Sequence, residues 1–406
     1  MRKRNALIGA ILVIGFGLLA ATDRVLQQRV EAQGGGTVRA PRFEVDPFWP
    51  KPLPNHWILG SAIGVWVDER DHVWIIHRSS ATLDNNEKAA ELKNAECCAG
   101  APPVLEFDAN GTLVQSWGGP GQGYEWPQSN HGIFLDHKGN VWIGGNGAGD
   151  SHILKFTRNG KFLAQYGKAG VHKGKGPTNA EGVSTFAGDS NDQQNFGRVA
   201  KIFVDPRDNE AYVADGYLNK RVAVLDADTG KMKRYWGAYG NKPDDRNAGP
   251  YDPNAPPAQQ FRNPVHCADV SVDNLVYVCD RVNDRLQVFT KDGKFVKESF
   301  IMKQTKASGS VWDVAFSRDP KQTYIFVLDG MNNRVHILLR DSLELLTSFG
   351  DGGRQPGQFF GVHSVAIDSK GNLYTTETWE GKRLQKFVFR GIGTVPRQQG
   401  TIRPGT

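Results

Sequence analysis

The sequence predicts an all-β protein built as a six-bladed β-propeller. A unit of four short apolar strands recurs six times along the chain, and a repeat of this size is typical of propellers. Within each unit apolar residues alternate with period two, as they do in half-buried strands. The 47 Gly and 21 Pro residues supply many turns, and no segment beyond the N-terminal region has a helical period.

Each predicted blade has an apolar first strand and a second strand that begins with an aromatic residue. Turns such as Lys138-Gly139-Asn140 and Lys370-Gly371-Asn372 suit hairpins. We expect Arg42-Phe43-Glu44-Val45 to pair with the last blade and close the ring, because closure removes free sheet edges. The six blades are predicted over 64–118, 131–167, 202–237, 270–300, 311–350 and 362–389.

The N-terminus is predicted to be a targeting segment. Arg2, Lys3 and Arg4 precede an apolar run, and Val30-Glu31-Ala32 suits cleavage after Ala32. The run is short for a membrane span, and an uncleaved anchor is the alternative. We therefore expect a periplasmic or secreted protein, anchored only if this segment is retained, with no stable membrane span in the mature chain. The expected regions are a signal peptide over 1–32, a segment with the ring-closing strand over 33–59, the propeller over 60–390 and a tail over 391–406.

Charge and cysteine content limit the classes of function. The net charge of +6 is spread along the chain without a compact basic and aromatic stretch, so we do not expect a nucleic-acid partner. Export permits disulfides among the four cysteines. Cys97 and Cys98 are adjacent and could bridge each other, bridge elsewhere or bind metal, whereas Cys267 and Cys279 flank a turn as a hairpin disulfide would. Ordinary buried thiols are the alternative for all four.

Three insertions interrupt the repeat. Segments 168–197 and 238–264 are rich in Gly, Pro, Asn and Asp, and 79–103 lies inside the first blade. Insertions of this kind emerge on one rim of a propeller and shape a pocket there, although solvated surface loops are the alternative.

Three histidines occupy equivalent positions in alternate blades. Each stands eleven residues before the aromatic residue of its second strand: His131 before Trp142, His266 before Tyr277, and His363 before Tyr374. First strands line the central channel, so these imidazoles are expected to converge at one rim. Three neutral imidazoles suit Zn²⁺ with a fourth position open. Channel histidines bonded to water or backbone are the alternative. In the other three blades the corresponding positions hold Ile63, Ala200 and Trp312.

Two further side chains are expected at this rim, because the second strand of each blade runs back toward it. Arg78 follows the second strand of the first blade and offers a fork for a carboxylate. Tyr217 follows that of the third blade and would be a general base if nearby cations stabilise its phenolate.

A tetrad before the third strand recurs in three blades, and it resembles the motif of NHL-repeat propellers. The tetrads are Asn219-Lys220-Arg221-Val222, Asn283-Asp284-Arg285-Leu286 and Asn332-Asn333-Arg334-Val335. Asp215, Asp280 and Asp329 precede them, and we expect each Asp to pair with the Arg that follows and fix the loop. These residues specify fold rather than chemistry.

The five candidate site residues together resemble the peptidyl-α-hydroxyglycine α-amidating lyase family over about residues 60 to 390. The resemblance is carried by Ile76-His77-Arg78, His131-Gly132-Ile133, Asp215-Gly216-Tyr217, Pro264-Val265-His266 and Val362-His363. It implies zinc at His131, His266 and His363, with Arg78 and Tyr217 in the active site. It also implies a calcium ion on the backbone carbonyls of Val65 and Ile133, where Ser364 replaces the family's Asp. Gly361 replaces a family Met, and the family's disulfide positions do not match these cysteines.

The implied reaction cleaves an N-acyl or peptidyl α-hydroxyglycine to a primary amide and glyoxylate. The partner would be a small molecule or peptide that carries a carboxylate. A non-catalytic NHL propeller, acting as an extracytoplasmic binding module, is the alternative. A lactonase-type propeller with carboxylates around calcium is a third interpretation, for which Asp269 and Asp313 are the nearest candidates.

Overall fold

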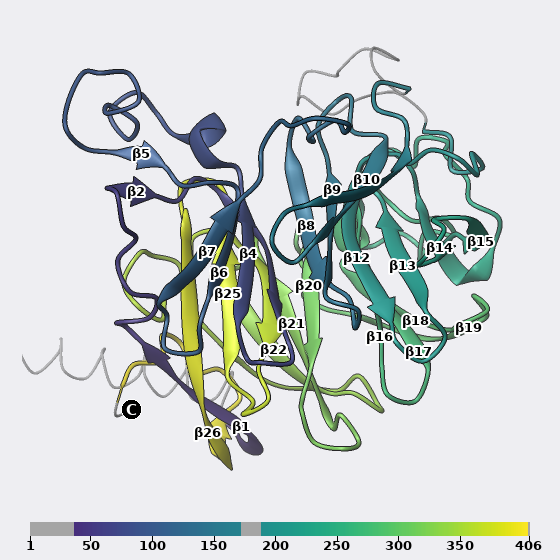
Figure 1. Ribbon diagram of the computed structural model, residues 1–406. Coiled ribbons are helices and arrows are strands. Elements are labelled where there is room, and N and C mark those ends of the chain that lie inside the picture. Colours follow the sequence, from purple (N-terminus) through teal and green to yellow (C-terminus); the bar gives the residue numbers. More distant parts are fainter. Residues whose placement is uncertain (1–35, 172–187, 405–406) are drawn as a thin grey trace, which may run out of the picture.

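The computed structural model describes residues 36–171 and 188–404, and within them the chain forms a six-bladed β-propeller (Figure 1). Each blade is a four-stranded antiparallel sheet whose first strand is innermost. The first strands contact one another in a closed ring in the order β3, β8, β12, β16, β20, β24 and back to β3. The predicted signal peptide over 1–32 lies outside the described residues.

The first three blades follow one another along the chain. The first consists of β3 (Ala62–Val67), β4 (Val73–His77), β6 (Val104–Phe107) and β7 (Leu113–Trp117). The second consists of β8 (Asn130–Leu135), β9 (Asn140–Gly145), β10 (His152–Thr157) and β11 (Phe162–Gly167). The third consists of β12 (Val199–Asp205), β13 (Glu210–Asp215), β14 (Arg221–Asp226) and β15 (Met232–Trp236).

The last three blades complete the ring. The fourth consists of β16 (Val265–Val270), β17 (Leu275–Asp280), β18 (Arg285–Thr290) and β19 (Phe295–Phe300). The fifth consists of β20 (Asp313–Phe316), β21 (Tyr324–Asp329), β22 (Arg334–Leu339) and β23 (Leu345–Phe349). The sixth consists of β24 (Val362–Ile367), β25 (Leu373–Glu377) and β26 (Arg383–Pro396), with β1 (Thr37–Asp46) as its outermost strand.

The ring closes by pairing the two ends of the described chain. Strand β1 runs antiparallel to β26, with Phe43 opposite Phe389 and Val45 opposite Phe387. The predicted ring-closing strand is therefore confirmed. Its inward side chains Phe43 and Val45 are buried between the fifth and sixth blades.

Short elements outside the blades lie in the insertions and tight turns. They are the parallel pair β2 (Trp57–Ile58) and β5 (Ala99–Gly100), and the 3-10 helices η1 (Ser79–Thr82), η2 (Ala238–Gly240) and η3 (Arg281–Asn283). The insertion that contains β5 projects from the upper left of Figure 1. No helix within residues 36–171 and 188–404 is long and apolar enough to cross a membrane.

The aromatic residue that opens most second strands anchors its blade. Trp74, Trp142, Tyr212, Tyr277 and Tyr374 are fully buried. Their polar atoms are not left unpaired: Trp142 Nε1 donates to Asp136 at 2.9 Å, and Tyr374 Oη donates to Asp368 at 3.1 Å. An indole or phenol can be buried in this way because its polar atom has a partner.

Two of the three predicted Asp–Arg pairs form as expected. Arg221 Nε lies 2.8 Å from Asp215 and Arg285 Nε lies 2.7 Å from Asp280, all fully buried. The prediction for the third was wrong: Asp329 contacts His336 Nε2 at 3.2 Å instead of Arg334. The sixth blade has an equivalent pair that the tetrad motif did not reveal, with Arg383 Nε 2.6 Å from Glu377.

Candidate metal centre

The three histidines meet at one end of the channel. His131, His266 and His363 stand on β8, β16 and β24, and each is less than 5% exposed. Their ring centroids are separated by 5.1, 4.8 and 4.9 Å, and one nitrogen of each lies within 4.8 Å of the others. The structure thus brings together the three residues that the alignment of blades selected.

Backbone bulges turn these side chains into the channel. The pairing of first and second strands slips between Asn130 and Ile133, between Val265 and Cys267, and between Val362 and Ser364, and each slip contains one histidine. A bulged residue leaves the ladder, so its side chain can be redirected. Equivalent slips in the first and third blades contain Ile63 and Ala200.

The intervening blades hold the imidazoles by their backbone carbonyls. His131 Nδ1 donates to Ala200 O at 2.7 Å, His363 Nδ1 donates to Ile63 O at 2.8 Å, and His266 Nδ1 donates to Trp312 O. A carbonyl can only accept, so each Nδ1 carries the proton and each Nε2 presents a lone pair. Burial lowers the pKa of His363 to about 3, and burial lowers the pKa values of His131 and His266 well below the usual range. All three imidazoles are therefore neutral at pH 7.

Tyr217 lies against the free nitrogens of two histidines. Its Oη is 2.9 Å from His131 Nε2 and 3.1 Å from His266 Nε2. One hydroxyl proton can serve only one of these acceptors at a time. The three Nε2 lone pairs converge, and there are too few protons to pair them all. Zinc binds such a set of imidazole nitrogens, and backbone carbonyls that accept from Nδ1 are usual partners of zinc-binding histidines. The residues present therefore fit zinc.

Two arginines flank Tyr217 on the same rim. Arg281 Nη1 donates to Tyr217 Oη at 3.1 Å, and its guanidinium lies 4.5 Å from the Trp312 ring centroid. Arg78 Nη2 donates to Asn146 Oδ1 at 3.0 Å. The Nε atoms of Arg78 and Arg281 are buried without a partner. Each arginine thus has one buried donor without a protein partner.

Sequence reasoning missed Arg281, although a signal was present. Arg78 follows the buried aromatic Trp74 of its second strand by four residues, and Arg281 follows Tyr277 by the same four. The sequence offset thus places both residues at the same level of the rim. The end of the fourth blade's second strand offers the same position as the strand ends that gave Arg78 and Tyr217.

An aromatic wall borders the site where the family has a methionine. Gly361 has φ +68°, and a Cβ there would lie 2.6 Å from the Trp379 ring, so the glycine makes room for this indole. The Trp379 ring stands 5.5 Å from that of Trp312, which in turn lies 5.5 Å from His363. Trp379 is 42% exposed and so is accessible to a ligand.

The four cysteines form two disulfides. Cys267 faces Cys279 across β16 and β17, with their Cα atoms 4.8 Å apart. Adjacent Cys97 and Cys98 form the other, in the insertion of the first blade. Neither disulfide leaves a thiol available as a metal ligand.

Several amidating enzymes are similar to this chain in sequence. The chain is 27% identical over 250 residues to peptidylglycine alpha-amidating monooxygenase of Rattus norvegicus, which covers 60% of this chain and 22% of that protein. It is 25% identical over 260 residues to peptidyl-glycine alpha-amidating monooxygenase B of Xenopus laevis, covering 63% of this chain and 26% of that one. This chain is homologous to these amidating enzymes. Because the match spans so little of their length, their whole activity is not carried over by it.

Solved structures support the fold alone. A streptogramin B lyase structure superposes with a TM-score of 0.51 at 13% identity, over 86% of this chain and 98% of that one. A protein of unknown function from Bacteroides thetaiotaomicron gives a TM-score of 0.51 at 11% identity, over 86% and 77%. No family model matches the chain.

Proposed function

We propose that this protein is a zinc-dependent lyase that cleaves an N-acyl or peptidyl α-hydroxyglycine to a primary amide and glyoxylate. The observation that carries the proposal is the convergence of three neutral imidazoles, two of which contact Tyr217, with Arg78 and Arg281 on the same rim. Homology to amidating enzymes over this region favours the same chemistry.

His131, His266 and His363 would hold the ion through Nε2. When bound, zinc supplies a Lewis acid that stabilises negative charge on the substrate oxygen. The remaining requirements of the reaction fall on side chains of this chain. They are a group that takes the hydroxyl proton, a group that holds the carboxylate, and a proton for the departing nitrogen.

Tyr217 is placed to take the hydroxyl proton at Oη. Arg281 Nη1 donates to this Oη at 3.1 Å and so orients it beside the imidazoles. As the proton leaves, the C–O bond becomes the C=O of glyoxylate and the C–N bond breaks. The proton taken by Tyr217 is then returned to the nitrogen, so that the amide leaves neutral and Tyr217 is restored. Arg78 and Arg281, beside Tyr217, would hold the substrate carboxylate and so fix the reacting carbon near Oη.

The proposed cellular setting is the periplasm or the exterior. Two disulfides are stable in an oxidising compartment and uncommon in the cytosol. The first 35 residues, which include the proposed signal peptide, lie outside the described part of the chain.

The test measures glyoxylate release from α-hydroxyhippurate, an N-acyl α-hydroxyglycine, by the mature protein with its metal content determined in parallel. We expect about one zinc per chain and stoichiometric glyoxylate and benzamide. Absence of bound metal after zinc is supplied would contradict the proposal. Unchanged binding of an extracellular ligand after loss of all three histidines would instead favour a binding module.

A further inference from the structure

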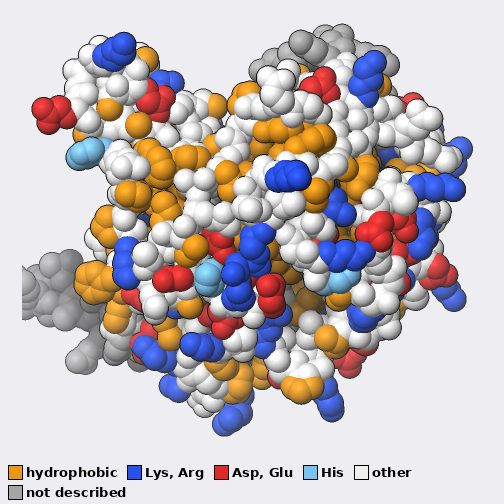
Figure 2. Space-filling model, viewed as in Figure 1, with side chains coloured by type: hydrophobic (Ala, Val, Ile, Leu, Met, Phe, Trp, Pro, Cys, Tyr) orange, Lys and Arg blue, Asp and Glu red, His pale blue; other side chains and the backbone are white. Residues whose placement is uncertain are grey.

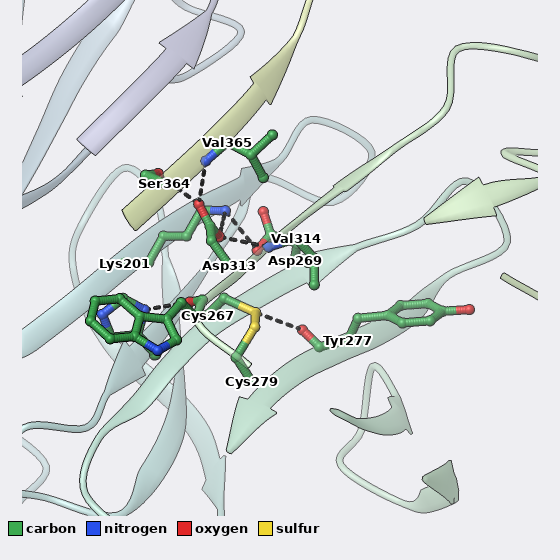
Figure 3. Close-up of a disulfide and its surroundings, with 11 residues drawn as sticks. Lys201, Cys267, Asp269, Tyr277, Cys279, Asp313, Val314, Ser364 and Val365 are labelled. Carbon is green, nitrogen blue, oxygen red and sulfur yellow. Dashed lines mark hydrogen bonds and ion pairs between the residues drawn. A yellow bond between two sulfur atoms is a disulfide. The ribbon is translucent and has the colours of Figure 1, made fainter. Parts of the chain in front are cut away.

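A buried lysine lies in the channel next to the histidine site. Lys201 on β12 is 8% exposed, and its Nζ lies 3.0 Å from Asp269 Oδ2 and 2.6 Å from Asp313 Oδ1. Figure 3 shows the ammonium directed at both carboxylates, with Ser364 and Val365 on the far side of Asp313. A void of about 10 Å³, roughly the size of one water, is lined by Lys201, Asp313 and all three histidines. The lysine cluster and the histidines therefore share one stretch of channel.

The carboxylate of Asp313 has no free acceptor position. Its Oδ1 accepts from Lys201 and from Val314 N at 2.9 Å. Its Oδ2 accepts from Ser364 Oγ at 2.6 Å and from Val365 N at 3.0 Å. A carboxylate offers about four acceptor positions, and here all are taken by N–H and O–H donors. Asp313 therefore has no oxygen position left for a calcium ion, and the Lys201 ammonium lies against Asp269 Oδ2, the nearest other carboxylate oxygen.

Lys201 carries the positive charge that the two aspartates require. Burial by itself would lower the pKa of Lys201, but Asp269 and Asp313 outweigh it and raise that pKa above its usual value. The ammonium is therefore charged at pH 7. A buried charge is tolerated when it is paired in this way.

Every member of the cluster is next to, or close to, a residue that builds the histidine site. Lys201 follows Ala200, whose carbonyl holds His131, and Asp313 follows Trp312, whose carbonyl holds His266. Ser364 follows His363. Asp269 lies on β16, as His266 does. The Cys267–Cys279 disulfide joins this strand to β17 (Figure 3).

We propose that the Lys201 ammonium is a built-in cation that takes the place of a channel calcium ion and positions the carbonyls and histidines of the metal centre. Lys201, Asp269, Asp313 and Ser364 come from the third, fourth, fifth and sixth blades. The cluster thereby ties four blades together beneath the site. The Val65 and Ile133 carbonyls, which family resemblance links to calcium, are then not needed as ligands. The zinc readout below rests on the proposed zinc centre, whereas the calcium readout does not.

The test compares Lys201→Met with the parent protein and with Lys155→Met. Lys155 is a matched control, because it is also buried, donates to Ala227 O at 2.7 Å and lies in the second blade near Asp136. Titration with CaCl₂ is followed by calorimetry and by the unfolding temperature, and zinc affinity is measured with a competing chelator.

We expect the parent and Lys155→Met to bind no calcium. Lys201→Met should gain a calcium site, show a higher unfolding temperature when calcium is added, and bind zinc about 10- to 100-fold more weakly, as outer-partner losses do. Calcium binding by the parent would overturn the proposal. So would a Lys201→Met variant that folds, ignores calcium and keeps parental zinc affinity.

A variant that fails to fold still gives a result. Folding of Lys201→Met only with calcium supports the proposal. Should it fail in both conditions, the neutral variant Lys201→Met/Asp269→Asn/Asp313→Asn decides. Weakened zinc binding in that folded variant supports a positioning role, and parental zinc affinity contradicts it. If the parent binds no zinc at all, the lyase proposal fails while the calcium measurement remains readable.

Discussion

Two buried clusters of ionisable residues lie along the same channel, and they differ in whether their polar groups are paired. The histidine trio has its Nδ1 protons committed to carbonyls, but the Nε2 lone pairs of His131 and His266 share one tyrosine proton. The lysine cluster pairs one ammonium with two carboxylates, and Asp313 is fully bonded. Both are almost inaccessible to solvent.

The difference shows that burial does not by itself mark a ligand site. Buried acceptors without protons are costly and call for a cation, whereas buried charges with complete partners form a closed structural unit. Charge on the surface gives no such guide, because Figure 2 shows acidic and basic side chains interspersed over the viewed face. Of the two aspartates that a lactonase-type site would need, Asp313 is fully bonded and Asp269 is paired with Lys201.

Removal of the trio should have the largest effect. In His131→Ala/His266→Ala/His363→Ala we expect zinc to be lost and glyoxylate release to fall by at least about 10³-fold, because the Lewis acid is gone. Metal analysis and a glyoxylate assay measure both. His152→Ala is the control, since His152 is equally buried but its Nε2 donates to Glu125 O outside the trio. Retention of one zinc by the triple variant would place the metal elsewhere.

Removal of the Tyr217 hydroxyl should have the second-largest effect on activity. Tyr217→Phe keeps the ring but deletes the proposed base, so we expect kcat to fall about 10²- to 10⁴-fold with zinc retained. Steady-state kinetics with parallel metal analysis check this. Tyr166→Phe, whose hydroxyl donates to Asp228 O on the outside of the propeller, should remain active. Parental kcat in Tyr217→Phe would exclude it as the base.

Loss of the Arg281 cation beside Tyr217 should have a smaller effect on activity. For Arg281→Met we expect kcat to fall about 10- to 100-fold, because one charge-assisted hydrogen bond to Oη is lost. Steady-state kinetics measure kcat and KM separately. A rise in KM at parental kcat would mean that Arg281 only holds substrate.

The buried histidines, in the trio and at His77, should respond to acid in the opposite direction to the aspartate of the lysine cluster. Burial lowers the pKa of His363 to about 3 and that of His77 to about 4 from 6.5. Between pH 6.5 and 4 the unfolded chain then binds protons that the folded chain excludes. Each such histidine should lower the unfolding free energy of metal-free protein by about 1 kcal/mol per pH unit as pH falls.

Asp269 acts against this trend, because burial raises its pKa to about 6 from 3.8. Between these values the folded chain holds the extra proton, so this group adds stability as pH falls. Burial also raises the pKa values of Asp280, Asp284 and Glu377, which act in the same direction as Asp269. The histidine contribution is therefore isolated by urea unfolding of metal-free parent and His363→Gln at pH 7 and pH 5, where the parent should lose about 2 kcal/mol more than the variant as pH falls. An equal pH dependence of the two proteins would contradict the neutral state assigned to His363.

The repeat was sufficient to predict the fold and to select the trio. Period-two strands and the aromatic residue of the second strand fixed the blade register, so equivalent positions could be compared without any structure. That comparison found the residues at His131, His266 and His363 and the ring-closing strand. The comparison failed at Asp329. The tetrad does not show that His336, two residues beyond Arg334 on β22, contacts Asp329 in place of Arg334.

The blade count, the ring closure and the equivalence of the three histidines can be predicted from the sequence, because they follow from local periodicity and from the closed symmetry of the repeat. Three features are visible only in the folded chain: the ring nitrogen that carries the proton in each imidazole, the contact of Arg281 with Tyr217, and the position of Lys201 in the channel. Those depend on bulges and on carbonyls of the neighbouring blade. Such contacts join residues up to 300 positions apart, and no local pattern encodes them.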